Sequence, residues 1–183
     1  MKRFLSVAAI ALFLPLVSAA QGQIKAQLFG GYSLAAKDFT YLPGVPNGWN
    51  ASLNVGNSHW GFLSDFGGYY NRCCQTVKSD TYTFLFGPQF TESADKYSVF
   101  VHALAGGAHN AYSDSSSVGN TSGISNPTTF AFGFGGGVDI RITHSLALRV
   151  QGDFLHTGIQ TLDNQLHPTR WNGRFSTGIV IDF

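Results

Sequence analysis

The sequence has 183 residues and a formal net charge of +1, with only 11% charged residues, 14% aromatic residues and 22 glycines. A charge this close to zero gives no electrostatic reason to bind nucleic acid or an anionic bilayer surface. The charged fraction is far below the roughly 25% of ordinary soluble domains, which argues against a globular domain surrounded by water.

Residues 1–20 have the features of a secretory signal peptide. The start "MKR" is basic, an apolar run follows as far as residue 17, and "SAA" provides the small residues that a signal peptidase reads. The run is too short for a stable membrane anchor, and no cysteine lies directly after the predicted cleavage region, so we expect no lipoprotein anchor. We therefore expect the mature chain to begin near Gln21, with residues 21–183 forming one barrel domain whose net charge is −1 once Lys2 and Arg3 are removed.

Beyond residue 20, apolar residues alternate with polar residues or glycine and do not recur at helical spacing, which is typical of strands. No stretch approaches the roughly 18 apolar residues of a transmembrane helix. We predict eight strands, at residues 24–34, 48–56, 60–70, 80–91, 97–109, 128–141, 146–158 and 172–183.

The alternation also predicts which face of the sheet meets lipid. In the strand at 80–91, Phe84 and Phe86 share one face and Thr83 lies on the other. The polar faces consist mainly of Ser, Thr, Asn, Gly and Gln, whereas a soluble surface carries about 25–35% charged residues. We expect the apolar face to contact lipid and the polar face to line a narrow lumen. A soluble ligand carrier with its apolar face inside is the alternative.

The predicted connections alternate between long and short. Long connections comprise residues 35–47, 71–79, 110–127 and 159–171, and short ones comprise 57–59, 92–96 and 143–145. Outer-membrane barrels have short periplasmic turns, longer external loops and an even number of strands. The sequence therefore predicts an all-β protein of the outer membrane: a closed eight-stranded antiparallel up-and-down transmembrane β-barrel with both ends of the domain on the periplasmic side.

Four segments carry a resemblance to a known group of proteins. They are "FGGYS" at 29–33, "FGPQF" at 86–90, "GGGVDIR" at 135–141 and "RFSTGIVIDF" at 174–183. Together, residues 24–183 resemble the small eight-stranded outer-membrane barrels of the OmpA/OmpX type and the porin-family single-barrel proteins of Gram-negative bacteria such as acidobacteria. The anchoring role of the OmpA periplasmic domain does not carry over, because these segments match only the barrel.

The same resemblance suggests how the chain is inserted. Ser176, Gly178, Ile181 and Phe183 match the carboxy-terminal signal of outer-membrane barrels, in which a polar residue and a glycine precede two apolar residues. The resemblance implies that the barrel-assembly machinery recognises the last strand. A strand that offers an unpaired edge until the barrel closes has the properties that such recognition needs.

Charged residues on the polar face form the first candidate site. They are Lys25, Asp65, Asp139, Arg141, Arg149, Asp153, Arg174 and Asp182. Eight strands enclose an interior just wide enough for side chains to fill, and an unpaired ion there is costly. We expect an internal network that plugs the lumen and helps to fix the strand register. A narrow, gated conduit whose ion pairs exchange partners is the alternative, and Asp182 lies close enough to the periplasmic end to be hydrated.

Two cysteines and six histidines show no motif of a metal or cofactor site. The Cα atoms of adjacent residues such as Cys73 and Cys74 lie about 3.8 Å apart, which is shorter than a disulfide normally requires. We expect a loop feature without chemistry there, with redox switching or pairing between molecules as the alternative. No HExxH pattern or other ligand spacing is present, so we expect no metal and no cofactor.

Aromatic residues lie near the predicted strand ends, where rings form girdles at the bilayer interfaces. They are Tyr32, Trp49, Trp60, Tyr69, Tyr70, Tyr82, Tyr97 and Trp171. Stacking on sugar or peptide outside the cell is the alternative for Trp49 and Trp171. The glycine run that begins at Gly133 predicts curvature and interior space in its strand rather than a nucleotide site.

A lipid-modifying enzyme on the same scaffold is a further alternative. Its site would need a nucleophile, a base and a carboxylate within hydrogen-bond reach, for which Ser33, His156 and Asp153 are the candidates. Nothing in their spacing requires such a site. We expect a monomeric, non-enzymatic protein with a structural or adhesion-like role through its external loops, whose partner the sequence does not name. A narrow porin-like channel for small solutes or ions is the alternative function.

Overall fold

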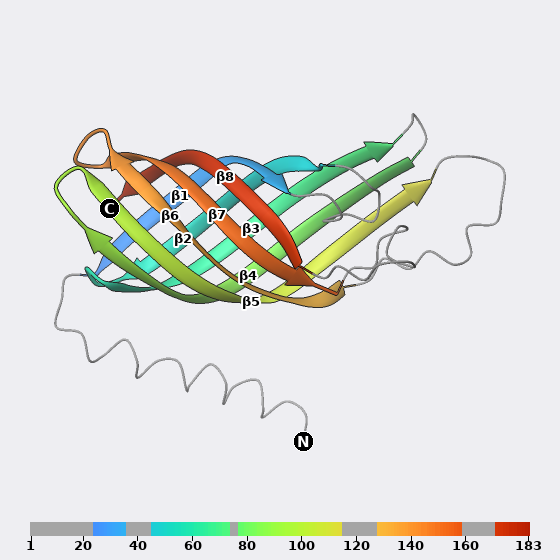
Figure 1. Ribbon diagram of the computed structural model, residues 1–183, viewed down its shortest axis with the longest axis horizontal. Coiled ribbons are helices and arrows are strands. Elements are labelled where there is room, and N and C mark those ends of the chain that lie inside the picture. Colours follow the sequence, from blue (N-terminus) through green and yellow to red (C-terminus); the bar gives the residue numbers. More distant parts are fainter. Residues whose placement is uncertain (1–23, 36–44, 74–76, 115–127, 159–170) are drawn as a thin grey trace, which may run out of the picture.

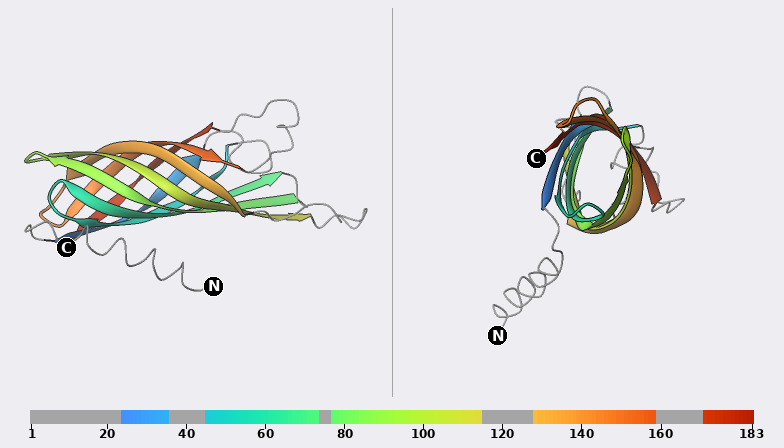
Figure 2. Two further views of the ribbon diagram at one scale, coloured as in Figure 1. Left: turned by 90° about the horizontal axis from the view of Figure 1, so that it is seen from below. Right: turned by 90° about the vertical axis from the view of Figure 1, so that its left-hand side faces the viewer.

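The computed structural model describes residues 24–35, 45–73, 77–114, 128–158 and 171–183. The strands in these ranges are β1 (Lys25–Ala35), β2 (Asn47–Gly56), β3 (Trp60–Cys73), β4 (Val77–Ser93), β5 (Tyr97–Asp114), β6 (Thr128–Arg141), β7 (Leu146–Thr157) and β8 (Trp171–Asp182). Each strand pairs with its neighbours in sequence, and β1 pairs with β8, so that the sheet closes into a barrel (Figures 1 and 2). The predicted fold is confirmed, whereas the predicted signal peptide at 1–20 lies outside the described residues.

No helix in the described ranges is long and apolar enough to cross a bilayer.

The register of the strands determines how the barrel closes. Following paired residues once around the barrel from Lys25 leads back to β1 at Ala35, ten residues further along the strand. The circuit passes in turn through Gly56, Gly61, Gln89, His102, Gly135, Asp153 and Arg174. A stagger of this kind requires strands that are tilted against the barrel axis. The tilt is visible in Figure 1, and the right-hand view of Figure 2 shows the closed ring from one end.

The apolar face of the sheet points outward. Phe84 and Val150 are each 37% exposed, whereas their neighbours Thr83 and Gln151 are each 3% exposed. The same alternation recurs along the other strands, with interruptions such as residues 135–138 of β6, because successive side chains point to opposite faces of a sheet. The arrangement is the one predicted from the sequence and leaves most of the large apolar side chains free to contact lipid.

Strands β3, β4 and β5 continue further than the sequence predicted. Residues 71–79, predicted to be a long loop, form most of a paired hairpin, since β3 extends to Cys73, which pairs with Val77. Strand β5 likewise extends to Asp114, beyond the predicted end at residue 109. These extensions are rich in polar residues, so the apolar alternation stops while backbone pairing continues. Cys73 is therefore the last residue of β3, and Cys74 lies outside the described residues.

The two ends of the barrel differ. One end, called here the turn end, has the connections 57–59, 94–96 and 142–145 and the residues Lys25 and Phe183. The opposite end, called here the loop end, has the connections 36–46, 74–76, 115–127 and 158–170. In Figure 1 the far parts of β3, β4 and β5 project at the loop end beyond the other strands. The predicted alternation of long and short connections therefore holds except at 74–76.

Most of the predicted girdle residues are exposed near the strand ends, but Tyr69 is not. Trp60 is 59% exposed and Tyr32 is 52% exposed, whereas Tyr69 is completely buried inside the barrel. Tyr69 lies on the inward-facing positions of β3, and a Cβ atom at Gly67 would contact its ring. The glycine therefore provides the space that this large side chain occupies in the lumen.

Candidate functional site

A network of buried charged residues crosses the middle of the lumen, and Arg174 lies at its centre. The Nε atom of Arg174 donates to Oδ2 of Asp153 at 2.7 Å, and its Nη1 atom donates to Oδ1 of Asp65 at 2.7 Å. The Nη2 atom of Arg174 donates to the other oxygen of Asp65 at 3.2 Å. None of these three side chains is more than 1% exposed. Because Asp65 belongs to β3 and Asp153 to β7, the guanidinium connects facing walls of the barrel.

His102 is part of this network, although the sequence patterns did not single it out. Its Nε2 atom lies 2.7 Å from Oδ1 of Asp153, even though strand β6 separates the two residues. Gly135 is the β6 residue that pairs with both of them, and a Cβ atom there would collide with the Asp153 carboxylate. The glycine therefore allows the two side chains to meet. A sequence signal was available: Val99 and Val101 point outward in β5, so the same alternation along the strand could have placed His102 inside.

Neutral side chains complete the hydrogen bonding of both carboxylates. Asn50 donates to Oδ2 of Asp65 at 2.9 Å, and Gln151 donates to Oδ2 of Asp153 at 3.1 Å. With the bonds from Arg174 and the contact with His102, every carboxylate oxygen of the pair has a partner. Buried ions are tolerated when their remaining lone pairs are satisfied in this way. We call Asp65, His102, Asp153 and Arg174, with these two amides, the lumen network.

A second buried ion pair lies nearer the turn end. The Nε and Nη2 atoms of Arg149 donate to the two oxygens of Asp139, each at 2.7 Å. The guanidinium carbon also lies 4.3 Å from the ring centre of Phe100 and 5.3 Å from that of Phe29. Cation–π contacts of this kind are stronger where water is excluded. Alternation had predicted a mainly polar interior, but several apolar side chains also point inward: these two rings contact a charged group, and Leu63, Leu85, Leu104 and Leu155 belong to a separate buried cluster.

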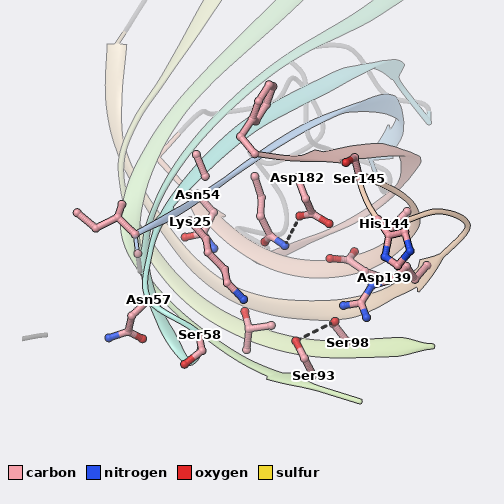
Figure 3. Close-up of a pocket in the computed structure, with 18 residues that line it drawn as sticks. Lys25, Asn54, Asn57, Ser58, Ser93, Ser98, Asp139, His144, Ser145 and Asp182 are labelled. Atoms are coloured by element: carbon pink, nitrogen blue, oxygen red, sulfur yellow. Dashed lines mark hydrogen bonds between the residues drawn. The ribbon is translucent and has the colours of Figure 1, made fainter. Parts of the chain in front are cut away.

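The remaining predicted lumen charges lie at the mouth of the barrel, outside the buried network. A cavity of about 620 Å³ opens at the turn end and is lined by Lys25, Arg141 and Asp182 among others (Figure 3). We call this cavity the vestibule. Asp182 accepts a hydrogen bond from Nε2 of Gln27 at 2.8 Å, while Lys25 and Arg141 are exposed. Among the described residues, neither cation has a carboxylate within 4.0 Å.

The residues of the predicted assembly signal lie at the seam between β8 and β1. Ser176 faces the lumen and its Oγ lies 2.8 Å from Oγ of Ser33, while Ile181 is 38% exposed on the outer face. Gly178 packs against β1, where a Cβ atom would collide with the backbone of residues 30 and 31. Phe183 is 75% exposed, and its amide donates to the carbonyl of Ala26 at 2.9 Å. Their role in recognition stays a prediction.

The candidate catalytic residues are not brought together. Asp153 faces the lumen and accepts from Arg174, whereas His156 lies on the outer face with its ring 4.8 Å from that of Phe132 and 5.4 Å from that of Trp171. Ser33 contacts Ser176 inside the barrel. In the part of the chain that the structure describes, no three His, Cys, Asp or Glu side chains form a group that could hold a metal ion.

Comparison with known proteins places the chain by its fold alone. No protein-family model matches the sequence, and no curated protein matches it either. Neisserial surface protein A matches with a TM-score of 0.58 and 13% identity, covering 87% of this chain and 97% of that one. Ail, the attachment invasion locus protein of Yersinia pestis, matches with a TM-score of 0.54 and 13% identity, covering 90% and 100%.

The outer membrane protein OprG from Pseudomonas aeruginosa matches with a TM-score of 0.58 and 8% identity, covering 89% of this chain and 98% of that one. These neighbours are small outer-membrane barrels, in agreement with the resemblance noted in the sequence. The identities are too low to carry a function from one chain to the other. The chain has the fold of the small eight-stranded outer-membrane barrels.

Proposed function

We propose that this chain is a non-enzymatic, monomeric protein of the outer membrane whose lumen is closed and whose loop end has a structural or adhesion-like role. The observation that carries the proposal is the position of Arg174, whose side chain is 0% exposed between Asp65 and Asp153. A guanidinium that connects opposite walls and is inaccessible to water leaves no open path at that level. The role therefore belongs to the surfaces of the barrel and not to a pore.

The outer-membrane location is supported by the band of exposed apolar side chains and by the fold. Short turns lie on the periplasmic side of such barrels, so the turn end faces the periplasm and the loop end faces outward. In this orientation the segment with Ser176, Gly178, Ile181 and Phe183 is presented to the barrel-assembly machinery during insertion, and lipid is the permanent partner of the outer face.

The loop end is the surface that we assign to the role outside the cell. There β3, β4 and β5 project beyond the rest of the barrel (Figure 1), and their hairpin includes exposed Lys78 and half-buried Asp80. Polar side chains on a rigid, paired extension are suited to contacts with other molecules in water. One fold neighbour is named for attachment and invasion, and attachment is the kind of role that we propose here.

Planar-bilayer recording of the refolded protein tests the closed lumen. We expect no stepwise conductance from the unaltered chain. A variant with Asp65→Gly, Asp153→Gly and Arg174→Gly removes the side chains that fill this level of the lumen, and it should conduct. Stepwise conductance by the unaltered chain would instead favour the narrow porin-like channel.

Replacing residues 71–79 with a short turn tests the role of the loop end. We expect the shortened protein to retain heat-modifiable migration in outer-membrane fractions, because the residues removed lie beyond the level of the lumen network. Cells that express it should aggregate less and adhere less to polystyrene than cells with the full-length protein. Equal aggregation and adhesion would contradict a role for the projecting hairpin.

A further inference from the structure

We propose that the vestibule at the turn end binds a small oxyanion, the carboxylate or phosphate group of a solute, with Lys25 and Arg141 as its charge partners. The cavity of about 620 Å³ is within the range of roughly 300–1,000 Å³ that is usual for small-molecule sites. Figure 3 shows Lys25, from β1, projecting into this space, with His144 of the β6–β7 turn also at its border. The proposal does not depend on what the loop end does.

The distribution of charge in the barrel points to an anion. Each arginine of the interior is matched by carboxylates, Arg149 by Asp139 and Arg174 by Asp65 and Asp153. The two cations that line the vestibule lack such a match among the described residues.

The carboxylates at the vestibule do not form ion pairs with these cations. Both oxygens of Asp139 accept from Arg149, and Asp182 accepts from the amide of Gln27. Counting full charges outside the Arg149–Asp139 pair, Lys25 and Arg141 are equal in number to Asp182 and the terminal carboxylate of Phe183, which also lines the vestibule. Neither of these carboxylates lies within 4.0 Å of Lys25 or Arg141, so both cations keep donors for a bound oxyanion.

Arg141 is positioned to receive such a group. Its Nη1 atom donates to the carbonyl oxygen of Asp95 at 3.0 Å, and its backbone amide donates to the carbonyl of Lys96 at 2.9 Å. These bonds attach the arginine to the β4–β5 turn without neutralising its charge, and they leave other N–H groups of the guanidinium for a ligand. A planar guanidinium with several donors matches the geometry of carboxylate and phosphate groups.

Hydroxyl groups on the neighbouring strands extend the polar lining. Ser93 of β4 and Ser98 of β5 are 3.0 Å apart at their Oγ atoms, and both line the vestibule (Figure 3). Since a hydroxyl group can donate to one partner and accept from another, this pair can bind an oxyanion while the bond between the serines persists. The lining therefore offers positive charge together with neutral donors.

Titration of the ¹⁵N-labelled full chain in lipid nanodiscs, followed by NMR, tests the site. The probes are sodium phosphate and sodium acetate, each compared with sodium chloride at equal ionic strength. We expect saturable shifts of the backbone amides around the vestibule with phosphate or acetate and not with chloride. The probe that binds with the higher affinity then identifies whether the site prefers a phosphate or a carboxylate group. Equal shifts with chloride, or no saturation with either probe, would overturn the proposal.

Matched variants distinguish binding of the oxyanion at a specific site from a general attraction of anions to the cations of the turn end. Lys25→Gln and Arg141→Gln should each weaken binding about tenfold, the usual effect of losing one hydrogen bond to a charged group. Lys96→Gln removes an equal charge from the turn end, but Lys96 does not line the cavity, so we expect less than about a twofold change. If Lys96→Gln weakens binding as much as Lys25→Gln, the proposal is wrong. Heat-modifiable migration of every variant confirms that the barrel has folded.

Discussion

Arg174 is the residue on which the lumen network most depends. Replacing it with leucine leaves Asp65 and Asp153 buried and facing each other without their shared cation. We expect the free energy of unfolding to fall by about 3–5 kcal/mol, the usual cost of removing one partner of a buried ion pair. Reversible urea unfolding in lipid vesicles measures the change. Arg141→Gln at the exposed mouth is the control and should cost less than about 0.5 kcal/mol; equal losses would mean that the network does not stabilise the barrel.

Gly135 provides a second test at the level of single residues. A methyl group there would collide with the Asp153 carboxylate and with the carbonyl oxygen of Gly152, so Gly135→Ala must displace Asp153 from His102. We expect a loss of about 1–3 kcal/mol in the free energy of unfolding, as for other overpacked interiors. Gly152→Ala is the matched control, because nothing lies within 4 Å of its added Cβ atom. A similar loss in both variants would show that replacing a glycine in a strand lowers the stability by itself. The contact between His102 and Asp153 across β6 would then not explain the effect.

Strand β8 combines two roles that mutation can separate. The side chain of Phe183 is 75% exposed, so it contributes little to the folded barrel, whereas the proposed assembly signal requires it. We expect Phe183→Ala to reduce the amount of protein in the outer membrane several-fold and to leave the urea midpoint in vesicles unchanged. Ile142→Ala, at an apolar residue that is 62% exposed at the same end of the barrel, is the control. A lower midpoint for Phe183→Ala would indicate a structural role instead.

The strands were predictable because alternation is a local property of the sequence. It placed Phe84 and Val150 outward and Asp139, Arg149 and Arg174 inward without reference to any other strand. The pairs across the lumen were not predictable in the same way. They depend on the register of all strands and on the stagger at closure, which alternation leaves undetermined.

Two features escaped prediction for related reasons. Phe29 and Phe100 are two of the apolar residues that lie at inward positions, although a pattern based on polarity alone would place such residues in lipid. The hairpin at 71–79 is paired but polar, because it extends past the apolar band and needs no lipid-facing side chains. In both places, position in the barrel and not composition determines the structure.

The whole molecule has an apolar exterior and holds its buried ion pairs inside, beside a cluster of apolar side chains, an inversion of the soluble barrel, whose charges face water. This inversion explains how a chain with only 11% charged residues can place several of them in its centre. Lipid requires no charge on the outer face, and the interior of an eight-stranded barrel is just wide enough for side chains such as these ion pairs to fill. The same inversion makes the outer face the part of the molecule where an added charge has the greatest effect.

Val150 tests whether the exposed apolar band lies in hydrocarbon. It is 37% exposed near the middle of β7, so Val150→Arg would place a charge in the interior of the bilayer. We expect a loss of about 2–4 kcal/mol in the free energy of unfolding in lipid vesicles, against about 0–1 kcal/mol for Tyr97→Arg at the turn end. Tyr97 is more exposed, at 53%, so exposure alone would predict no such difference. If the two variants lose equal stability in vesicles, the band is not immersed in lipid and the transmembrane assignment fails. If the difference is present in vesicles and disappears in detergent micelles, the bilayer itself causes the cost.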